Sequence, residues 1–203
     1  MGTKASATRE RILQQGLELM SREGMSGVTL GQMADRVGMS KSGLFAHFRS
    51  KDEVQIGLLE HMGRMAASHV IEPAMAAPEG LPRLEALVGL WFGWSEKAGL
   101  PGGCPVAAAM FELDDVESPV RDKVAAMEAE WRGLLEGLVR AAVDLGHLRP
   151  DLDVEQFVWE LCGIYLSHHV SHRFLRRPDA DSRAWTAFEA LRERATPSKP
   201  RRR

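Results

Sequence analysis

Closely spaced helix-capping signals between Thr29 and Glu53 constrain the fold of this chain more than any other feature. Thr29 and Gln32 form a capping box, in which two side chains bond the free backbone N–H groups at the start of a helix. Ser50 and Glu53 form a second capping box a short distance along the chain. Only short helices fit between these signals. The segment is therefore predicted to be a compact set of helices joined by tight turns.

The rest of the chain reads as one helix after another. Apolar residues recur at helical spacing throughout, and neither strand-like alternation nor an internal repeat is found. With 203 residues, of which 44% are hydrophobic and 27% are charged, the chain can bury a substantial core. We predict an all-α fold. Helices are expected at residues 8–23, 29–38, 40–48, from 50 onward, 82–94, 105–113, 118–146, 153–174 and 181–194.

The first two short helices are joined by a very tight turn. Gly38 supplies the left-handed conformation of that turn, and Ser40 caps the second helix. This is the arrangement of a helix-turn-helix. The start of its second helix can meet a phosphate, and its first residues can reach base edges in the major groove. Lys41, Ser42 and Gly43 lie at this tip, so we predict docking on double-stranded DNA.

Positive charge is concentrated in the N-terminal third. The whole chain has a net charge of −2, whereas Met1 to Arg64 holds nine Lys/Arg and seven Asp/Glu. A generally basic, nucleic-acid-coating protein is therefore excluded. We predict that bases or the nearby backbone are contacted by Lys41, Ser42 and Gly43, and that phosphates are contacted by Thr29, Ser40, His47 and Lys51. Leu44, Phe48 and Met33 are assigned to the core. The alternative that stays open is a helix-turn-helix that binds no DNA and whose basic side chains are only solvated.

Residues Arg9 to Met62 resemble the DNA-binding domain of the TetR family of transcriptional repressors. The resemblance rests on "RERILQQGLELMSREGMSGVTLGQMADRVGMSKSGLFAHFRSKDEV". It implies a three-helix DNA-binding domain at residues 1–50 and a larger helical ligand-binding and dimerisation domain at 51–195, followed by a basic tail at 196–203 that we expect to be disordered. It also implies a homodimer that represses from an inverted-repeat operator and is released by a small-molecule effector. Phe45 stands where the family usually has a phosphate-binding tyrosine.

The predicted ligand pocket and dimer interface are drawn from the apolar residues of the C-terminal part. Aromatic and thioether side chains suit a flat or greasy organic molecule. The pocket candidates are Trp91, Trp94, Met110, Phe111, Trp131, Trp159 and Tyr165. The resemblance places the dimer interface on the last two helices, and the interface candidates are Val158, Cys162, Leu166, Trp185, Phe188 and Leu191. A purely structural role in the core stays open for both sets.

Other functional classes find less support in the sequence. His168 and His172 have a spacing compatible with metal, but no matched ligand stands nearby, so neither a metal nor a cofactor is predicted. A redox role for Cys104 stays open beside an inert one. No recognisable catalytic motif is present, and we predict that the chain is not an enzyme. An architectural DNA-binding protein without sequence preference stays the main alternative. With two cysteines and no membrane-spanning run, the chain is expected to be cytoplasmic.

Overall fold

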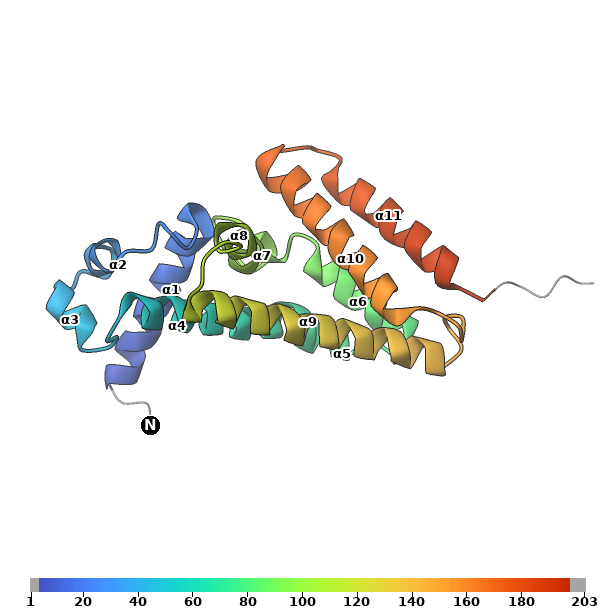
Figure 1. Cartoon of the computed structure of the whole chain (residues 1–203), viewed down its shortest axis with the longest axis horizontal. Helices are drawn as coiled ribbons and strands as arrows, with labels where there is room; N and C mark the ends of the chain where they lie inside the picture. Colours follow the sequence, from blue (N-terminus) through green and yellow to red (C-terminus); the bar gives the residue numbers. More distant parts are fainter. Residues whose placement is uncertain (1–3, 198–203) are drawn as a thin grey trace, which may run out of the picture. The chain divides into compact units, whose positions relative to one another are not determined.

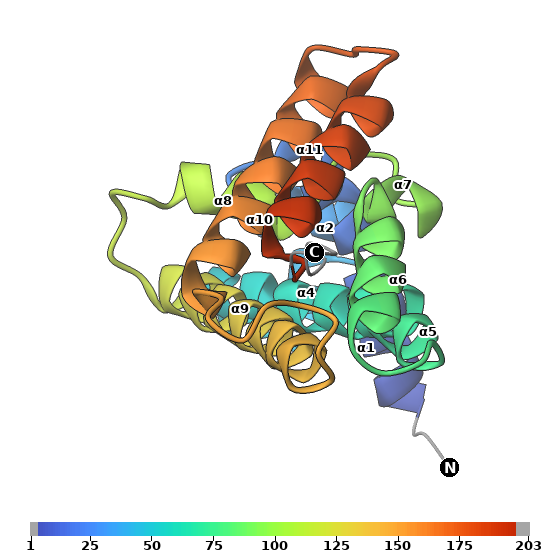
Figure 2. The same ribbon diagram turned by 90° about the vertical axis from the view of Figure 1, so that its right-hand side faces the viewer.

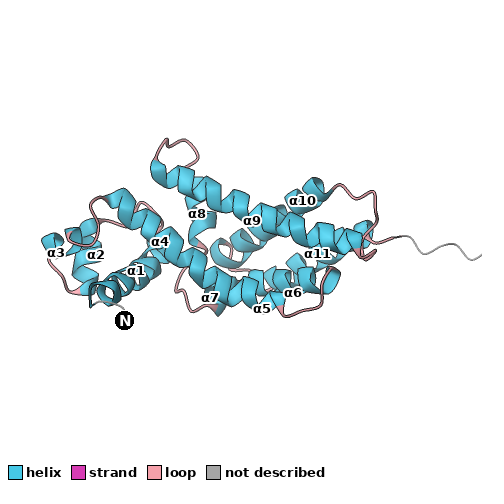
Figure 3. Ribbon diagram, turned by 90° about the horizontal axis from the view of Figure 1, so that it is seen from below, coloured by secondary structure: helices cyan, strands magenta, loops and turns pink. Residues whose placement is uncertain are grey.

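The computed structural model describes residues 4–197, and within this range helices joined by loops are the only regular secondary structure, with no strand (Figures 1 and 3). The prediction of an all-α fold is confirmed. The α-helices are α1 (Lys4–Glu23), α2 (Leu30–Val37), α3 (Lys41–Phe45), α4 (Lys51–Ala66), α5 (Glu72–Met75), α6 (Leu81–Trp91), α7 (Trp94–Lys97), α8 (Pro105–Glu112), α9 (Pro119–Asp144), α10 (Val154–His169) and α11 (Ala180–Ala195), with π-helical turns η1 (Ala67–Ile71) and η2 (Val170–Phe174).

Packing divides the chain into two compact units. The first unit runs up to Ala67 and also includes Ser95–Glu128, whereas the second consists of Ser68–Trp94 together with the chain from Ala129 onward. Helices α7 and α8 therefore pack with the N-terminal helices, although they lie far from them in sequence. The functional division between residues 50 and 51 stays a prediction. The basic tail predicted for 196–203 lies, from residue 198, outside the described residues.

The first unit is built around α1, which packs against α2, α4 and α8. Its apolar stripe meets the stripe of α2, and Leu17 and Met33 are fully buried where they meet. Leu44 and Phe48 are fully buried as well, so their assignment to the core, like that of Met33, is confirmed. Burying a large apolar side chain is worth roughly 1.5–3 kcal/mol, which holds the very short α3 in place.

The second unit holds an aromatic core between α6, α9 and α10. Trp91 stacks on Tyr165 with ring centroids 4.1 Å apart, and Trp131 meets Trp91 edge-on at 4.8 Å. Helices α10 and α11 lie side by side, joined by η2 and a short loop (Figures 1 and 2). An ion pair of 2.6 Å between Arg192 and Glu85 ties α11 to α6. Packing across several helices therefore defines this unit.

Three helix ends differ from the sequence prediction. The helix expected at 40–48 is α3, which ends at Phe45. The helix expected at 82–94 ends at Trp91, because Gly93 takes a left-handed conformation (φ 69°) and Trp94 begins the separate α7. The helix expected at 153–174 is α-helical only to His169 and then widens into the π-helical turn η2. The widened turn changes which side chains share a face.

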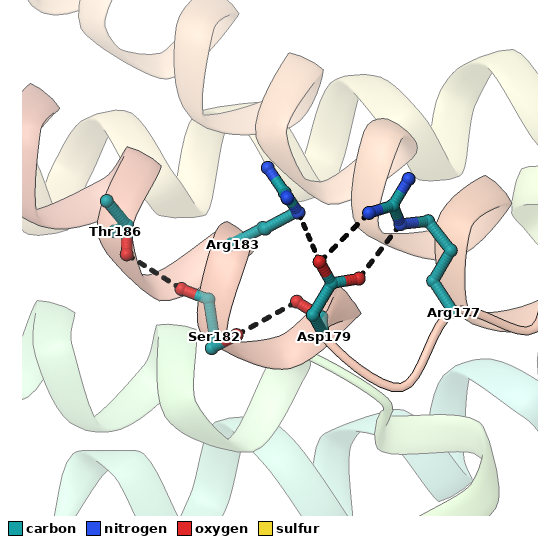
Figure 4. Close-up of polar contacts among 5 residues, drawn as sticks. All are labelled: Arg177, Asp179, Ser182, Arg183 and Thr186. Atoms are coloured by element: carbon teal, nitrogen blue, oxygen red, sulfur yellow. Dashed lines mark hydrogen bonds and ion pairs between the residues drawn. The ribbon is translucent and has the colours of Figure 1, made fainter.

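Asp179 organises the start of α11. Its carboxylate accepts hydrogen bonds from Arg177 Nε (2.8 Å) and Nη2 (2.9 Å) and from Arg183 Nε (2.6 Å) (Figure 4). These bonds hold the pKa of Asp179 well below its usual range. Ser182 donates to the Asp179 carbonyl oxygen, and Thr186 donates to that of Ser182. The network fixes the turn that reverses the chain after η2. Among the described residues, no helix is long and apolar enough to cross a membrane.

Candidate DNA-binding surface

The turn between α2 and α3 has the predicted conformation. Gly38 is left-handed (φ 67°, ψ 37°), and its N–H donates to the Asp35 carbonyl oxygen at 3.2 Å. The N–H of Met39 donates to the Ala34 carbonyl oxygen at 2.9 Å, which completes the cap of α2. A side chain with a Cβ would be strained at Gly38 because of its positive φ. The turn is therefore closed tightly enough to set α3 at a fixed angle to α2.

Polar caps place the predicted contact residues on the exposed side of α3. Ser40 Oγ accepts the Gly43 N–H at 3.1 Å and lies 3.0 Å from Ser42 Oγ. Lys41 and Ser42 are both exposed. The buried side chains of α3 point the opposite way, into the first unit. The short helix therefore presents a cationic and hydroxyl-bearing edge to solvent, as recognition of a duplex requires.

The starts of α2 and α4 add to the same surface. Thr29 Oγ1 caps α2 by accepting the Gln32 N–H at 3.2 Å. A Cβ at Gly31 would lie 3.4 Å from Lys41 Cε, so Lys41 reaches across to the first turn of α2. Ser50 Oγ accepts the Glu53 N–H at 3.1 Å, and Lys51, which begins α4, is exposed. Three successive helix starts thus carry all of the predicted phosphate contacts except His47, which follows the end of α3.

Phe45 and His47 complete the predicted set. Phe45 is 47% exposed, so its ring is accessible to a DNA backbone, whereas His47 is half-buried. Arg9 of α1 was not among the predicted site residues. Its guanidinium lies 4.7 Å from the centre of the Phe48 ring, and so brings a further positive charge beside α3. Only the fold could reveal this, because Arg9 is distant in sequence.

Comparison with protein families agrees with this geometry. Residues 12–55 match the model of bacterial regulatory proteins of the tetR family. Residues 80–188, more than half of the chain, match the model of the tetracyclin repressor-like C-terminal domain. The chain belongs to the TetR family. It is thus a DNA-binding regulator of this family, with an N-terminal helix-turn-helix and a helical C-terminal domain.

Individual relatives support the assignment to the TetR family. Nucleoid occlusion factor SlmA from Vibrio vulnificus is 29% identical over 136 residues, which cover 66% of this chain and 69% of that protein. SlmA from Cronobacter sakazakii is 28% identical over 186 residues, covering 90% of this chain and 93% of that protein. These matches extend well beyond the helix-turn-helix. The likeness therefore includes much of the C-terminal part.

Solved structures show that the TetR fold is shared. A TetR-family regulator from Cytophaga hutchinsonii has a TM-score of 0.86 and 17% identity, covering 98% of this chain and 100% of that chain. A transcriptional regulator from Saccharomonospora viridis, solved in complex with choline, has a TM-score of 0.77 and 19% identity, covering 95% and 100%.

The seven predicted pocket residues are not all brought together in this TetR-family chain. Trp91, Trp131 and Tyr165 form the aromatic core of the second unit, and Trp94 is buried. Trp159 is 65% exposed on α10. Met110 and Phe111 belong to the first unit, where Phe111 is 62% exposed. The side chains of Trp159 and Phe111 are thus not enclosed in the interior of the protein, and their assignment to a ligand pocket stays a prediction.

Most of the predicted interface residues face the core of their own unit. Val158, Cys162, Phe188 and Leu191 are buried within the protomer. Trp185 is half-buried against the rings of Phe92 and Phe188, and Leu166 is half-buried. The helical period correctly identified an apolar stripe, but the sequence could not show which neighbour covers it. The surface between α10 and α11 is a groove of about 460 Å³, which is lined by Leu191 of the predicted set and by other residues, among them Trp159, Gly163, Ile164 and Ala187.

The histidines of α10 and η2 are engaged within the second unit. His168 is buried, its Nε2 lies 2.7 Å from Asp181 Oδ1, and its ring stacks on those of Phe92 and His172. Burial, with the nearby charges of Arg173 and the other two histidines, lowers the pKa of His169. The described residues contain no group of three or more possible metal ligands. Cys104 is buried at the start of α8.

Proposed function

We propose that the chain is a sequence-specific repressor that binds an inverted-repeat operator as a homodimer and is released by a small organic effector. The observation that carries the proposal is the exposure of Lys41, Ser42 and Lys51 at the capped starts of α3 and α4, next to the capped start of α2. One such surface reads few bases. A two-fold dimer reads two half-sites about 34–36 Å apart, which supplies the missing specificity.

Selection of bound duplexes from a random pool tests DNA recognition. The selection is run at about 150 mM salt, where nonspecific electrostatic binding is weak. Enrichment of an inverted repeat is the expected result, and the most enriched duplex then serves as the operator probe. Binding at low salt only, with no enriched sequence, would contradict specific repression and would favour the architectural alternative.

The exposed face of α10 supports the dimer. Trp159, Gly163 and Ser167 follow one another at helical spacing along it, and η2 continues the stripe with Val170 (41% exposed) and Phe174 (82% exposed). Large apolar side chains stand at both ends and small residues in the middle. Such a stripe is complementary to itself when a second copy lies antiparallel, because small residues let two helices approach closely.

The register of this antiparallel pair follows from the spacing. A two-fold axis near Leu166 and Ser167 places Trp159 opposite the partner's Phe174, and Gly163 opposite the partner's Val170. The charges of the two copies are also complementary in this antiparallel pair. The N-terminal half of α10 carries Glu155 and Glu160, and it would lie beside the basic side chains that follow the C-terminal end of the partner's α10. Glu160 already pairs with Arg194 of α11, so the acidic end is held in place.

Cysteine cross-linking tests this arrangement. In a Ser167→Cys variant the two new thiols lie near the axis, within the range of about 4.4–6.8 Å between Cα atoms that a disulfide needs. A Gln156→Cys variant is the matched control, because an antiparallel arrangement keeps its two copies far apart. Mild oxidation should cross-link the first variant only. Cross-linking of the second would contradict the antiparallel register. The native Cys104 and Cys162 are buried and contribute little background.

The effector is proposed from the aromatic character of the second unit. Its interior is rich in indole and phenol rings, which suit a flat or greasy ligand. The similar protein from S. viridis holds choline, a small organic cation, so small organic molecules of this kind are a reasonable first library. Release of the selected duplex by a library member is the expected result. If no member of the library releases the duplex, the proposal of an effector of this kind is contradicted.

A second candidate function follows from the names of the relatives. The nucleoid occlusion factor of C. sakazakii aligns along 90% of this chain, so an action on the nucleoid, instead of on a promoter, is a specific alternative. Mapping the bound sites across the genome of the source organism distinguishes the two. Sites confined to one or a few promoters favour the repressor, whereas sites spread over much of the chromosome favour the nucleoid function.

A further inference from the structure

The turn between α1 and α2 is held by a residue from far along the chain. Glu112, the last residue of α8, accepts the Met25 N–H on Oε1 at 3.1 Å and the Ser26 N–H on Oε2 at 3.0 Å. Both oxygens of one carboxylate thus bind two successive backbone N–H groups. Hydrogen bonds to an ionised acceptor are about twice as strong as neutral ones. This contact therefore fixes the conformation of the turn.

The loop before α8 docks on the end of α1 through its backbone. The Gly103 N–H donates to the Ser21 carbonyl oxygen at 3.0 Å, and the Gly102 N–H donates to Ser21 Oγ at 3.1 Å. A Cβ at Gly102 would lie 1.7 Å from the Ser21 carbonyl oxygen. Only glycine permits so close an approach of two backbones. Residues 102–112 therefore grip both the end of α1 and the turn that follows it, and we call this segment the clip.

Met25 is also held from its other side. Its carbonyl oxygen accepts Gln55 Nε2 of α4 at 2.8 Å, and its side chain is buried. The N–H and the carbonyl oxygen of one residue are thus bound by side chains from two different helices. The turn leads within a few residues to Thr29, the cap of α2. Any shift of Met25 is therefore passed on to α2 and, through the tight turn at Gly38, to α3.

We propose that Glu112 is a positioning residue for DNA binding, and that the clip holds α2 and α3 in the geometry that reads the operator. The inference rests on the proposed function, since it concerns the same surface. It assigns part of the DNA-reading apparatus to a segment that falls within the C-terminal family model. Control of DNA binding then needs no direct contact with α2 or α3, because displacement of the clip moves both helices through the turn at Met25.

The sign of the effect separates positioning from simple electrostatics. Glu112 carries a negative charge in the unit that binds DNA, and a negative charge repels phosphates. Removing it would tighten DNA binding if charge alone mattered. If Glu112 acts by holding the turn, removing it weakens binding. The two explanations therefore predict opposite changes.

The test compares Glu112→Ala with Glu117→Ala in the full-length chain. Glu117 is an exposed acid in the loop that follows the clip, so the two variants lose the same charge. Glu112→Ala should bind the selected duplex about tenfold more weakly, because two charge-assisted hydrogen bonds are lost. Glu117→Ala should bind as tightly as the wild type or slightly more tightly. The slope of log affinity against log salt should stay unchanged in Glu112→Ala, since no phosphate contact is removed.

A second variant and a second measurement guard against misfolding. Glu112→Gln keeps one oxygen acceptor in nearly the same shape, and should bind with intermediate affinity. Hydrogen exchange of the Met25 and Ser26 amides should accelerate in both variants, while exchange in the second unit stays unchanged. Wild-type affinity in Glu112→Ala and Glu112→Gln would overturn the inference. Failure of the wild-type chain to select any duplex would instead contradict the proposed function.

Discussion

The rings of Trp91 and Tyr165 lie almost parallel, with an interplanar angle of 10° and centroids 4.1 Å apart. One ring comes from α6 and the other from α10, so the stack joins two helices separated by more than sixty residues of chain. The edge-on contact of Trp131 extends the stack to α9. Together the three rings bridge the main helices of the second unit.

Replacing Trp91 with Ala should lower the free energy of unfolding by about 3–5 kcal/mol, because a large buried ring leaves a cavity between three helices. Phe111→Ala serves as the control, since its exposed ring should change stability by no more than about 0.5 kcal/mol. Urea unfolding followed by circular dichroism measures both variants. Similar losses in the two would show that the stack contributes nothing special.

Replacing Lys51 with Ala should weaken binding to all duplexes and reduce the salt slope by about 1, as expected for a lost phosphate contact. Ser42→Ala should instead change the preferred base at one or two positions, because Ser42 lies on the exposed edge of α3. Selection from a random pool at several salt concentrations measures both effects. Equal losses on every duplex for both variants would refute this division between phosphate and base contacts.

Phe45→Tyr should tighten binding about fivefold, the equivalent of roughly one hydrogen bond of 1 kcal/mol. Phe45 is half-exposed, so a hydroxyl on its ring can reach solvent or a phosphate without disturbing the core. Titration of the selected duplex measures the change. Unchanged affinity would mean that the ring points away from the DNA backbone.

Replacing Gly163 with Leu should convert the dimer to a monomer and lower operator affinity by at least tenfold. No atom lies within 4 Å of a Cβ built at Gly163, so the protomer itself has room for the side chain, whereas the proposed close approach of two copies does not. Gly137→Leu, at an equally open and exposed position on α9, is the control. Sedimentation measures the oligomeric state. A dimeric Gly163→Leu protein would argue against this interface.

The free energy of unfolding should decrease as the pH falls below about 6.5, the ordinary pKa of histidine. Burial between α1 and α4 lowers the pKa of His61, outweighing the attraction of Glu10, whose Oε1 lies 3.0 Å from His61 Nδ1. The unfolded chain therefore takes up a proton at a higher pH than the folded one, and stability is lost as the pH falls through this interval. Urea unfolding between pH 5 and 8 should show a smaller decrease in His61→Gln. An identical pH dependence would exclude His61 as a cause.

The capping residues allowed most of the helices to be predicted. The sequence could not show which apolar helix faces are covered by other helices. Thr29, Ser40, Ser50 and Asp153 each cap a helix as expected, because capping depends on residues only a few positions apart. Phe111 and Phe188 have similar sequence surroundings, yet one is exposed and the other buried. The pairing of apolar helix stripes depends on contacts between residues that are far apart in the chain.

The same reason explains which parts of the site escaped the sequence. The predicted DNA contact residues of α2 and α3 are neighbours in the chain, so the sequence alone indicated that they form one surface. Glu112 binds a turn more than eighty residues away, and nothing in its own surroundings marks it. Gly102 lies in a glycine- and proline-rich loop that reads as an ordinary connection, although it touches α1 directly.

Because Glu112 binds main-chain N–H groups, its hold on the turn does not depend on which side chains the turn carries. A helix-turn-helix from a relative with another operator could therefore be grafted onto this chain and still be gripped, provided that the glycine turn after α1 is kept. Such an interface lets operator preference diverge between relatives while the control elements stay the same. Chimeric regulators joined at this point should thus inherit their operator from one parent and their response from the other.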